Sequence, residues 1–205
     1  MKNIIILSTM LLTLFALGSC SESEEVSEYD NWQVRNQQYV DSIAALAGAG
    51  TDGWTKIVAY TLVDSVENKN PDPNHYVYVQ KVSQGAGTRY PMYNDSIRVH
   101  YLGRLIPSEA YPQGRIFGKS YSTNELNEAT DVPTLMALNS NIVGFATATL
   151  HMVEGDAWKI VVPYYLGYGE DDYSSASIPG FSTLIFDIKL ARIYRYKVDT
   201  DTSWQ

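Results

Sequence analysis

The run VEGDAWKIVVPYYLGYG, residues 153–169, joins a predicted strand to a loop rich in tyrosine. After the Glu154-Gly155 turn, residues 157–162 contain the β-branched and aromatic side chains that favour a strand. Pro163 ends this strand, because proline has no N–H to donate to a sheet ladder. The tyrosines that follow are separated by glycines, whose backbone freedom allows a loop to turn aromatic rings toward a pocket. The run therefore predicts a strand that leads into a pocket wall.

Further stretches on both sides of this run carry a resemblance to a known family. They are DSIRVHYLG at 95–103, GRIFGKSY at 114–121, SNIVGF at 140–145 and SIPGFSTLIFDIKL at 177–190. Together they resemble the FKBP-type peptidyl-prolyl isomerases, in which D-x-V-x-V-H-Y-x-G, G-x-x-F-D-S-S, x-V-I-x-G-W and I-P-P-x-[SA]-T-L-[IV]-F-[DE]-[VI]-x-L occur in this order. The resemblance covers residues 75–196 and implies an α+β fold, a curved antiparallel sheet wrapped around one short helix.

Local patterns add detail to this expected domain. Residues 76–82 alternate as in a strand, which the Gly85-Ala86-Gly87 loop follows, and residues 107–113 form an insertion in the next hairpin. The short helix is expected after residue 140, with Ser140 as its N-terminal cap.

The segment before the domain, residues 31–74, is interpreted as an extension. Between Asp30 and Leu46 apolar residues recur at helical spacing, with Asp30 or Asn31 as the cap and Gly48 as the stop. Residues 54–66 predict at least one strand, and residues 68–74 a turn. We expect the helix to be dispensable for the fold of the remainder, because the family resemblance begins only near residue 75.

The N-terminus has the pattern of a bacterial lipoprotein signal. Lys2 precedes an apolar run from Ile4 to Leu14, and small residues lead directly to Cys20, the only cysteine. Residues 1–19 are then a signal peptide, Cys20 is the lipid-modified N-terminus, and residues 20–30 are an acidic tether at a bacterial membrane, which we expect to be the outer membrane. The alternative is an ordinary secretory signal with an incidental cysteine. Residues 197–205 are a polar tail.

Composition excludes several other functions. The 205 residues fit one domain, and the formal net charge of -8 argues against a nucleic-acid partner, which requires a basic face. The three histidines are scattered along the sequence, so neither a metal site nor another cofactor is expected. With one cysteine there is no internal disulfide, and stability must come from packing.

The family resemblance also implies a set of site residues. A proline-sized pocket would be lined by Tyr101, Phe117, Ile142, Phe145, Tyr168 and Phe186. Phe145 stands in the place of the floor tryptophan, the Tyr168 hydroxyl would reach the substrate carbonyl, and the Ile142 N–H would be a second donor. The alternative for each aromatic residue is that its ring only packs in the hydrophobic core and lines no binding site.

The chain departs from the family pattern at three positions. Gly118 occupies the place of an aspartate, Asn141 that of a valine, and Gly180 that of the second proline of I-P-P. Three hypotheses remain open, and the missing aspartate separates the first from the second. The first is a lipid-anchored isomerase that assists the folding of exported proteins by acting on proline-containing segments. The second is a peptide-binding module with little turnover, and the third is a scaffold.

Overall fold

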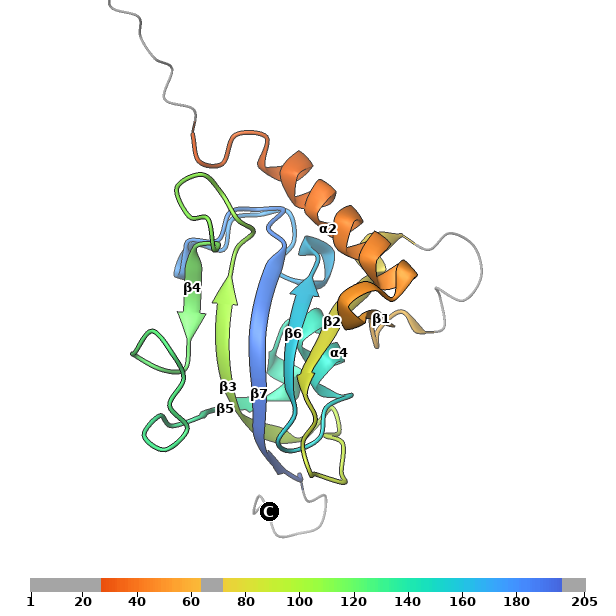
Figure 1. The fold of residues 1–205 in the computed structure, drawn as a ribbon, viewed down its shortest axis with the longest axis vertical. Helices are drawn as coiled ribbons and strands as arrows, with labels where there is room; N and C mark the ends of the chain where they lie inside the picture. The colour runs from red at the N-terminus through yellow and green to blue at the C-terminus, as the bar shows by residue number, and fades with distance from the viewer. Residues whose placement is uncertain (1–26, 64–71, 197–205) are drawn as a thin grey trace, which may run out of the picture. The chain divides into compact units, whose positions relative to one another are not determined.

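The computed structural model describes residues 27–63 and 72–196, and residues 31–196 of this set belong to one compact unit. The predictions for residues 1–26, including Cys20, for residues 64–71 and for the tail at 197–205 lie outside the described residues. The unit is built on a seven-stranded sheet in which every pairing is antiparallel. Figure 1 shows the sheet with its two labelled helices. The predicted α+β fold is confirmed.

The strands follow the order β1-β2-β6-β7-β3-β4, and β5 also pairs with β3. Their bounds are β1 (Trp54–Val58), β2 (Tyr76–Ser83), β3 (Ser96–Arg104), β4 (Ile116–Lys119), β5 (Thr134–Ala137), β6 (Ala157–Val162) and β7 (Leu184–Tyr194). The helices are α2 (Trp32–Ala49) and α4 (Val143–Thr149), with 3-10 turns η1 (Thr51–Gly53), η2 (Pro73–His75), η3 (Leu138–Ser140), η4 (Tyr164–Leu166) and η5 (Ser174–Ala176). The family-like stretches thus form the strands β3, β4, β6 and β7 and the beginning of α4.

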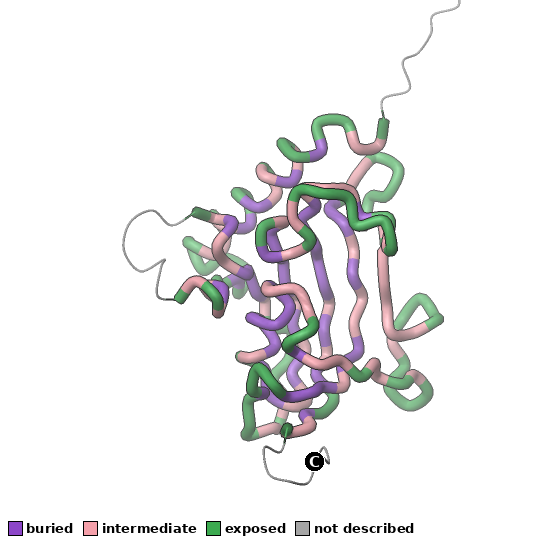
Figure 2. The backbone as a smooth tube through the Cα atoms, turned by 180° about the vertical axis from the view of Figure 1, so that it is seen from behind, coloured by how far each residue is buried: buried purple, intermediate pink, exposed green. Residues whose placement is uncertain are grey.

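The short helix α4 packs on β1, β2 and β6, on the face of the sheet away from α2. Its central residues are buried, as Figure 2 shows from behind. Gly144 is required there, because a Cβ at this position would overlap the Val162 side chain. The expected cap is wrong, since Ser140 lies in η3 and the helix begins after Ile142 without any side-chain cap. The 3-10 turn takes the chain past Ser140 before the helical backbone starts.

Helix α2 packs against β1 and β2. Its buried residues recur at helical spacing: Trp32, Asn36, Val40 and Ile43. The helix passes Gly48, the predicted stop, and ends at Ala49. Gly50 closes it, because its left-handed backbone (φ 64°) directs its N–H back to the last carbonyls.

Two buried hydrogen bonds connect α2 to the start of β7. The Trp32 Nε1–H donates to Ser182 Oγ at 2.9 Å, and the Thr183 N–H donates to Asn36 Oδ1 at 2.7 Å. The partners are about 150 residues apart in sequence, since the two separations are 150 and 147. These contacts oppose the expectation that the domain is independent of this helix.

The predicted strand at residues 54–66 is shorter than expected, because β1 ends at Val58 and a turn follows. β1 pairs with β2, so the extension adds an edge strand to the sheet. In β2 the predicted alternation breaks down: Val77, Tyr78 and Val79 are all buried. The reason is that β2 contacts α4 and α2 as well as its neighbouring strands.

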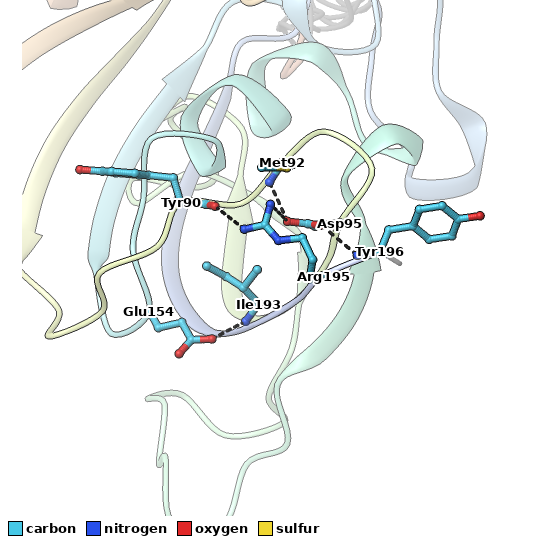
Figure 3. Close-up of polar contacts among 7 residues, drawn as sticks. All are labelled: Tyr90, Met92, Asp95, Glu154, Ile193, Arg195 and Tyr196. Carbon is cyan, nitrogen blue, oxygen red and sulfur yellow. Dashed lines mark hydrogen bonds and ion pairs between the residues drawn. The ribbon is translucent and has the colours of Figure 1, made fainter. Parts of the chain in front are cut away.

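A polar cluster fixes the C-terminal end of β7, as Figure 3 shows. The Asp95 carboxylate is only 1% exposed and accepts the N–H groups of Met92 and Tyr196. It also pairs with Arg195 at 3.3 Å. Nearby, Glu154 accepts the Ile193 N–H at 2.7 Å. Asp95, the first residue of the DSIRVHYLG stretch, therefore ties the beginning of β3 to the end of β7.

Candidate functional site

A cavity of about 300 Å³ gathers all six of the predicted site residues. They come from five separate parts of the chain: Tyr101 on β3, Phe117 on β4, Ile142 and Phe145 at the start of α4, Tyr168 after β6, and Phe186 on β7. The remaining lining residues are Gly118, Met136, Ser140, Asn141, Tyr173 and Ala176. The fold therefore brings the predicted set together, while the role of the set stays a prediction.

Three phenylalanines form part of the cavity wall. The Phe186 ring lies 5.4 Å from the Phe145 ring and 5.5 Å from the Phe117 ring, at interplanar angles of 76° and 88°. Edge-to-face packing of this kind fixes ring orientation as well as burying apolar surface. Phe145 and Phe186 are 3% and 5% exposed, so they present a small, rigid apolar surface to any ligand.

Gly103 provides the space for these rings. It pairs with Phe186 on one side and with Gly118 on the other. A Cβ at Gly103 would lie 2.6 Å from the Phe117 ring and 3.0 Å from the Phe186 ring. Any larger residue would therefore displace the cavity wall.

Tyr168 lies at the mouth of the cavity and is 36% exposed. Its hydroxyl has no hydrogen-bond partner among the residues that the structure describes. Burial raises the pKa of Tyr168 above its ordinary value, and the neighbouring Tyr173 and Tyr101 raise it further. The hydroxyl is consequently protonated at neutral pH and available as a donor.

A second free donor is the backbone N–H of Ile142. Ile142 lies at the beginning of α4, where the first N–H groups of a helix have no intrahelical acceptor. Within the described ranges nothing accepts this N–H. Beside it, Asn141 donates from Nδ2 to the Ala137 carbonyl at 2.6 Å, which supports the turn before the helix. The polar side chain in place of valine thus has a structural partner.

Gly118 leaves an open position next to Tyr101. A Cβ built there would lie 3.5 Å from the Tyr101 ring and 3.6 Å from its hydroxyl, which is ordinary van der Waals contact. The backbone of Gly118 does not have a positive φ. An aspartate would therefore fit without backbone strain, with its carboxylate close to the Tyr101 hydroxyl.

The structure explains why position 180 is a glycine and not the proline of the family pattern. A Cβ at this position would overlap the Glu170 carbonyl, and the Gly180 N–H donates to Asp172 Oδ1 at 2.8 Å. Proline could meet neither condition, because it has a ring and no N–H. The departure from I-P-P therefore follows from how the 169–181 loop packs.

The sequence analysis missed Tyr173, Met136 and Ala176 among the lining residues, and Tyr173 is the one with an aromatic ring. Its ring stacks on Tyr168, with centroids 4.1 Å apart and an interplanar angle of 12°. In sequence it stands in an acidic loop that carried no family motif, and the only signal was another tyrosine five positions after Tyr168. The loop conformation, which no local pattern predicts, brings it to the cavity.

Another cavity, of about 310 Å³, is bordered by β2, β3, β6, β7 and the loop after β4. Only Tyr101 of the predicted set lines it. Its lining includes His100, which is 4% exposed and whose Nδ1 has no partner among the described residues. No cluster of metal-binding side chains occurs in residues 27–63 and 72–196. The cavity with the free tyrosine hydroxyl and the free Ile142 N–H is the better candidate site.

The sequence of this chain matches a known protein family. Residues 87–191, just over half of the chain, match the sequence model of the FKBP-type peptidyl-prolyl cis-trans isomerases. The chain belongs to this family.

Proteins from three organisms are similar to this chain in sequence. The macrophage infectivity potentiator of Trypanosoma cruzi is 34% identical over 56% of this chain and 51% of its own length. The FKBP-type 22 kDa peptidyl-prolyl cis-trans isomerase of Escherichia coli is 36% identical over 55% of this chain and 47% of its own length. The peptidyl-prolyl cis-trans isomerase Mip of Coxiella burnetii is 33% identical over 55% of this chain and 43% of its own length. The chain thus spans about half of the length of these relatives.

The FKBP-like fold extends beyond the matched sequence. A peptidyl-prolyl cis-trans isomerase from Pseudomonas syringae superposes with a TM-score of 0.51 over 78% of this chain and 95% of its own. Its sequence identity of 22% makes this a similarity of fold alone.

None of the described helices has the length and apolar character needed to span a membrane.

Proposed function

We propose that this FKBP-type chain is a peptidyl-prolyl cis-trans isomerase whose active site is the 300 Å³ cavity. The observation that carries the proposal is the convergence of six aromatic or apolar residues on one cavity that also presents two free donors. The activity named for the E. coli and C. burnetii relatives supports the same reaction.

The reaction suits such a site because it makes and breaks no covalent bond. The trans form of an X-Pro bond is favoured by only about 0.5–1 kcal/mol, but rotation has a barrier of ~18–20 kcal/mol, since twisting destroys amide resonance. A catalyst must therefore favour the twisted amide. An apolar surface replaces water around the less polar twisted carbonyl, and fixed donors stabilise it.

Each part of the cavity has a role in this scheme. The proline ring would rest on Phe145 and Phe186, with Phe117 and Tyr101 at the sides. The Tyr168 hydroxyl and the Ile142 N–H would donate to carbonyl oxygens of the bound peptide. No cofactor is needed for rotation about the bond.

A peptide-binding module with little turnover is the second candidate, and Gly118 is the observation that favours it. A cavity without a carboxylate beside Tyr101 retains its apolar wall and its donors, which are sufficient for binding. It has one fewer fixed charge to stabilise the twisted amide. Binding and turnover therefore have to be measured separately.

We further propose that the protein works at the cell envelope. The apolar run that ends at Cys20 supports a lipid anchor, which would hold residues 20–30 as a tether and residues 75–196 as the FKBP-like domain. The partners would be proline-containing segments of exported proteins, and the membrane would be contacted only through the lipid.

One assay tests the main proposal. Refolding of a protein limited by proline isomerisation should accelerate when the domain is added, and a fluorescent proline peptide should bind. Binding without acceleration would establish the second candidate. Absence of both would overturn both proposals and leave a scaffold.

Gly118→Asp separates the two candidates further. Because the position accommodates a side chain without strain, the variant should melt like the wild type. If the cavity is an isomerase site that lacks a carboxylate, kcat/KM should increase by about tenfold, the effect of roughly 1.4 kcal/mol in the barrier. A well-folded Gly118→Asp protein with unchanged kcat/KM would show that this carboxylate contributes nothing here.

A further inference from the structure

The loop at residues 169–181 has its two arms cross-linked. Tyr173 and Ile178 exchange backbone hydrogen bonds of 2.8 and 3.1 Å. The Phe181 N–H donates to the Gly169 carbonyl at 2.9 Å, and the Asp172 side chain accepts the Gly180 N–H. Ile178 is 1% exposed, so the loop is also anchored in the core. The backbone position of Tyr173 is therefore well determined.

This backbone holds the Tyr173 ring flat against Tyr168. The rings are 4.1 Å apart and nearly parallel, and both line the cavity. One face of Tyr168 is consequently covered, and the ring cannot rotate toward the loop. The stack limits the directions in which the Tyr168 hydroxyl points.

We propose that Tyr173 is a positioning residue that orients the Tyr168 hydroxyl toward the bound peptide and completes the cavity wall at its mouth. The inference rests on the proposed function, because it concerns the same proline-containing ligand. It assigns a role to a residue outside the family motifs. The ring of Tyr173 has this role, and its hydroxyl, which has no partner among the described residues, does not.

The electrostatics of the pair provide an independent readout. Burial is the largest cause of the raised pKa of Tyr168, and Tyr173 is the next. Removing the Tyr173 ring should expose Tyr168 and lower its pKa toward the ordinary value. A residue that only stabilises the loop would leave this pKa unchanged.

The experiment compares three substitutions at one position. Tyr173→Ala removes the ring, Tyr173→Leu retains apolar bulk without a stacking plane, and Tyr173→Phe retains the ring. We expect kcat/KM with a proline peptide to fall by about two- to tenfold in the first two, the range for an aromatic pair, and to remain at the wild-type level in the third. Tyr111→Ala is the matched control, since Tyr111 is 44% exposed and does not line the cavity.

A double-mutant cycle with Tyr168→Phe tests whether Tyr173 acts through the Tyr168 hydroxyl. In the Tyr168→Phe background, Tyr173→Ala should cost less kcat/KM than in the wild type. In parallel, the Tyr168 pKa is followed by NMR of tyrosines labelled at Cζ, with the Tyr168 signal assigned by its absence in Tyr168→Phe. The pKa should fall in Tyr173→Ala and stay raised in Tyr173→Phe.

The outcomes separate this inference from the function on which it rests. A wild-type protein that neither isomerises nor binds peptides contradicts the proposed function. An active wild type with an equally active, well-folded Tyr173→Ala variant overturns only the inference. Additive losses in the cycle, or an unchanged Tyr168 pKa, would likewise make Tyr173 a merely structural residue.

Discussion

Phe186 contacts both of the other phenylalanines of the cavity, and Gly103 on the adjacent strand leaves room for these contacts. A single residue can therefore shape the cavity in two ways: it can contribute an aromatic ring to the wall, or it can leave space because it has no side chain. Gly118 belongs to the second kind, because the space beside Tyr101 could hold a carboxylate that this chain does not have. At this scale the chemistry depends on a few groups that are still free to bind, above all the Tyr168 hydroxyl.

Tyr168→Phe removes that hydroxyl and leaves the ring in place. Since the hydroxyl has no partner in the described parts of the chain, the free energy of unfolding should change by less than about 1 kcal/mol. A lost hydrogen bond to the twisted amide should lower kcat/KM by roughly tenfold. Thermal melts and the refolding assay measure the two effects. A destabilised variant with normal activity would make Tyr168 a core residue.

His100 predicts a pH dependence of stability. It is 4% exposed, and burial lowers its pKa below the ordinary value of about 6.5, while Glu128 and Asp131 oppose the shift and Lys189 adds to it. The unfolded state then binds more protons in the window between the folded pKa and about pH 6.5. His100 therefore contributes stability above this window, and the contribution is lost as the pH falls through it.

The measurement is urea unfolding at several pH values between about 7 and 5. We expect the free energy of unfolding of the wild type to decrease more steeply toward acid than that of His100→Gln, whose side chain does not titrate. Parallel curves for the two proteins would contradict a buried neutral histidine.

Among the elements, α2 has the largest consequence for how the molecule is divided. The helix lies outside the residues that match the family, yet it accepts the Thr183 N–H at the start of β7 and donates to Ser182. β7 carries Phe186, so the helix supports the strand that forms the centre of the cavity wall. The 169–181 loop has a similar position, because its conformation brings Tyr173 to the cavity.

Asn36→Ala tests the support that α2 gives. Asn36 is 1% exposed, and its loss would leave the buried Thr183 N–H without an acceptor. The free energy of unfolding should fall by about 1–3 kcal/mol. Gln38→Ala on the exposed side of the same helix is the matched control and should be nearly neutral. An Asn36→Ala protein as stable as the control would restore the expectation that the helix is dispensable.

At the scale of the whole molecule, family membership and the FKBP-like fold are established, and the activity and envelope location are proposals. The formal net charge of -8 is opposite in sign to the basic face that a nucleic-acid partner would require. The proposed anchor at Cys20 would confine this domain to a membrane surface.

Mass spectrometry of the protein from the native membrane fraction tests the anchor. We expect an N-terminal peptide that begins at Cys20 and carries a lipid adduct. Cys20→Ser should release the protein from the membrane fraction, with the fold of the domain unchanged. An unmodified Cys20, or cleavage at another residue, would contradict the lipoprotein interpretation.

The sequence by itself determined the fold class and the identities of the residues that now line one cavity. This was possible because the motifs around Tyr101, Phe145 and Phe186 are local stretches that resemble those of a known family, and the resemblance implied both the fold and the cavity. It also marked Gly118 and Gly180 as departures, without the reason for either.

Only the tertiary structure decided the rest. Asn36 meets Thr183 across 147 residues, Glu170 fills the space beside Gly180, and a cross-linked loop places Tyr173 on Tyr168. Each of these contacts joins groups whose local sequence is compatible with many conformations. The packing of the whole unit selects one of them, because buried polar groups must find partners and rings must fill the remaining space.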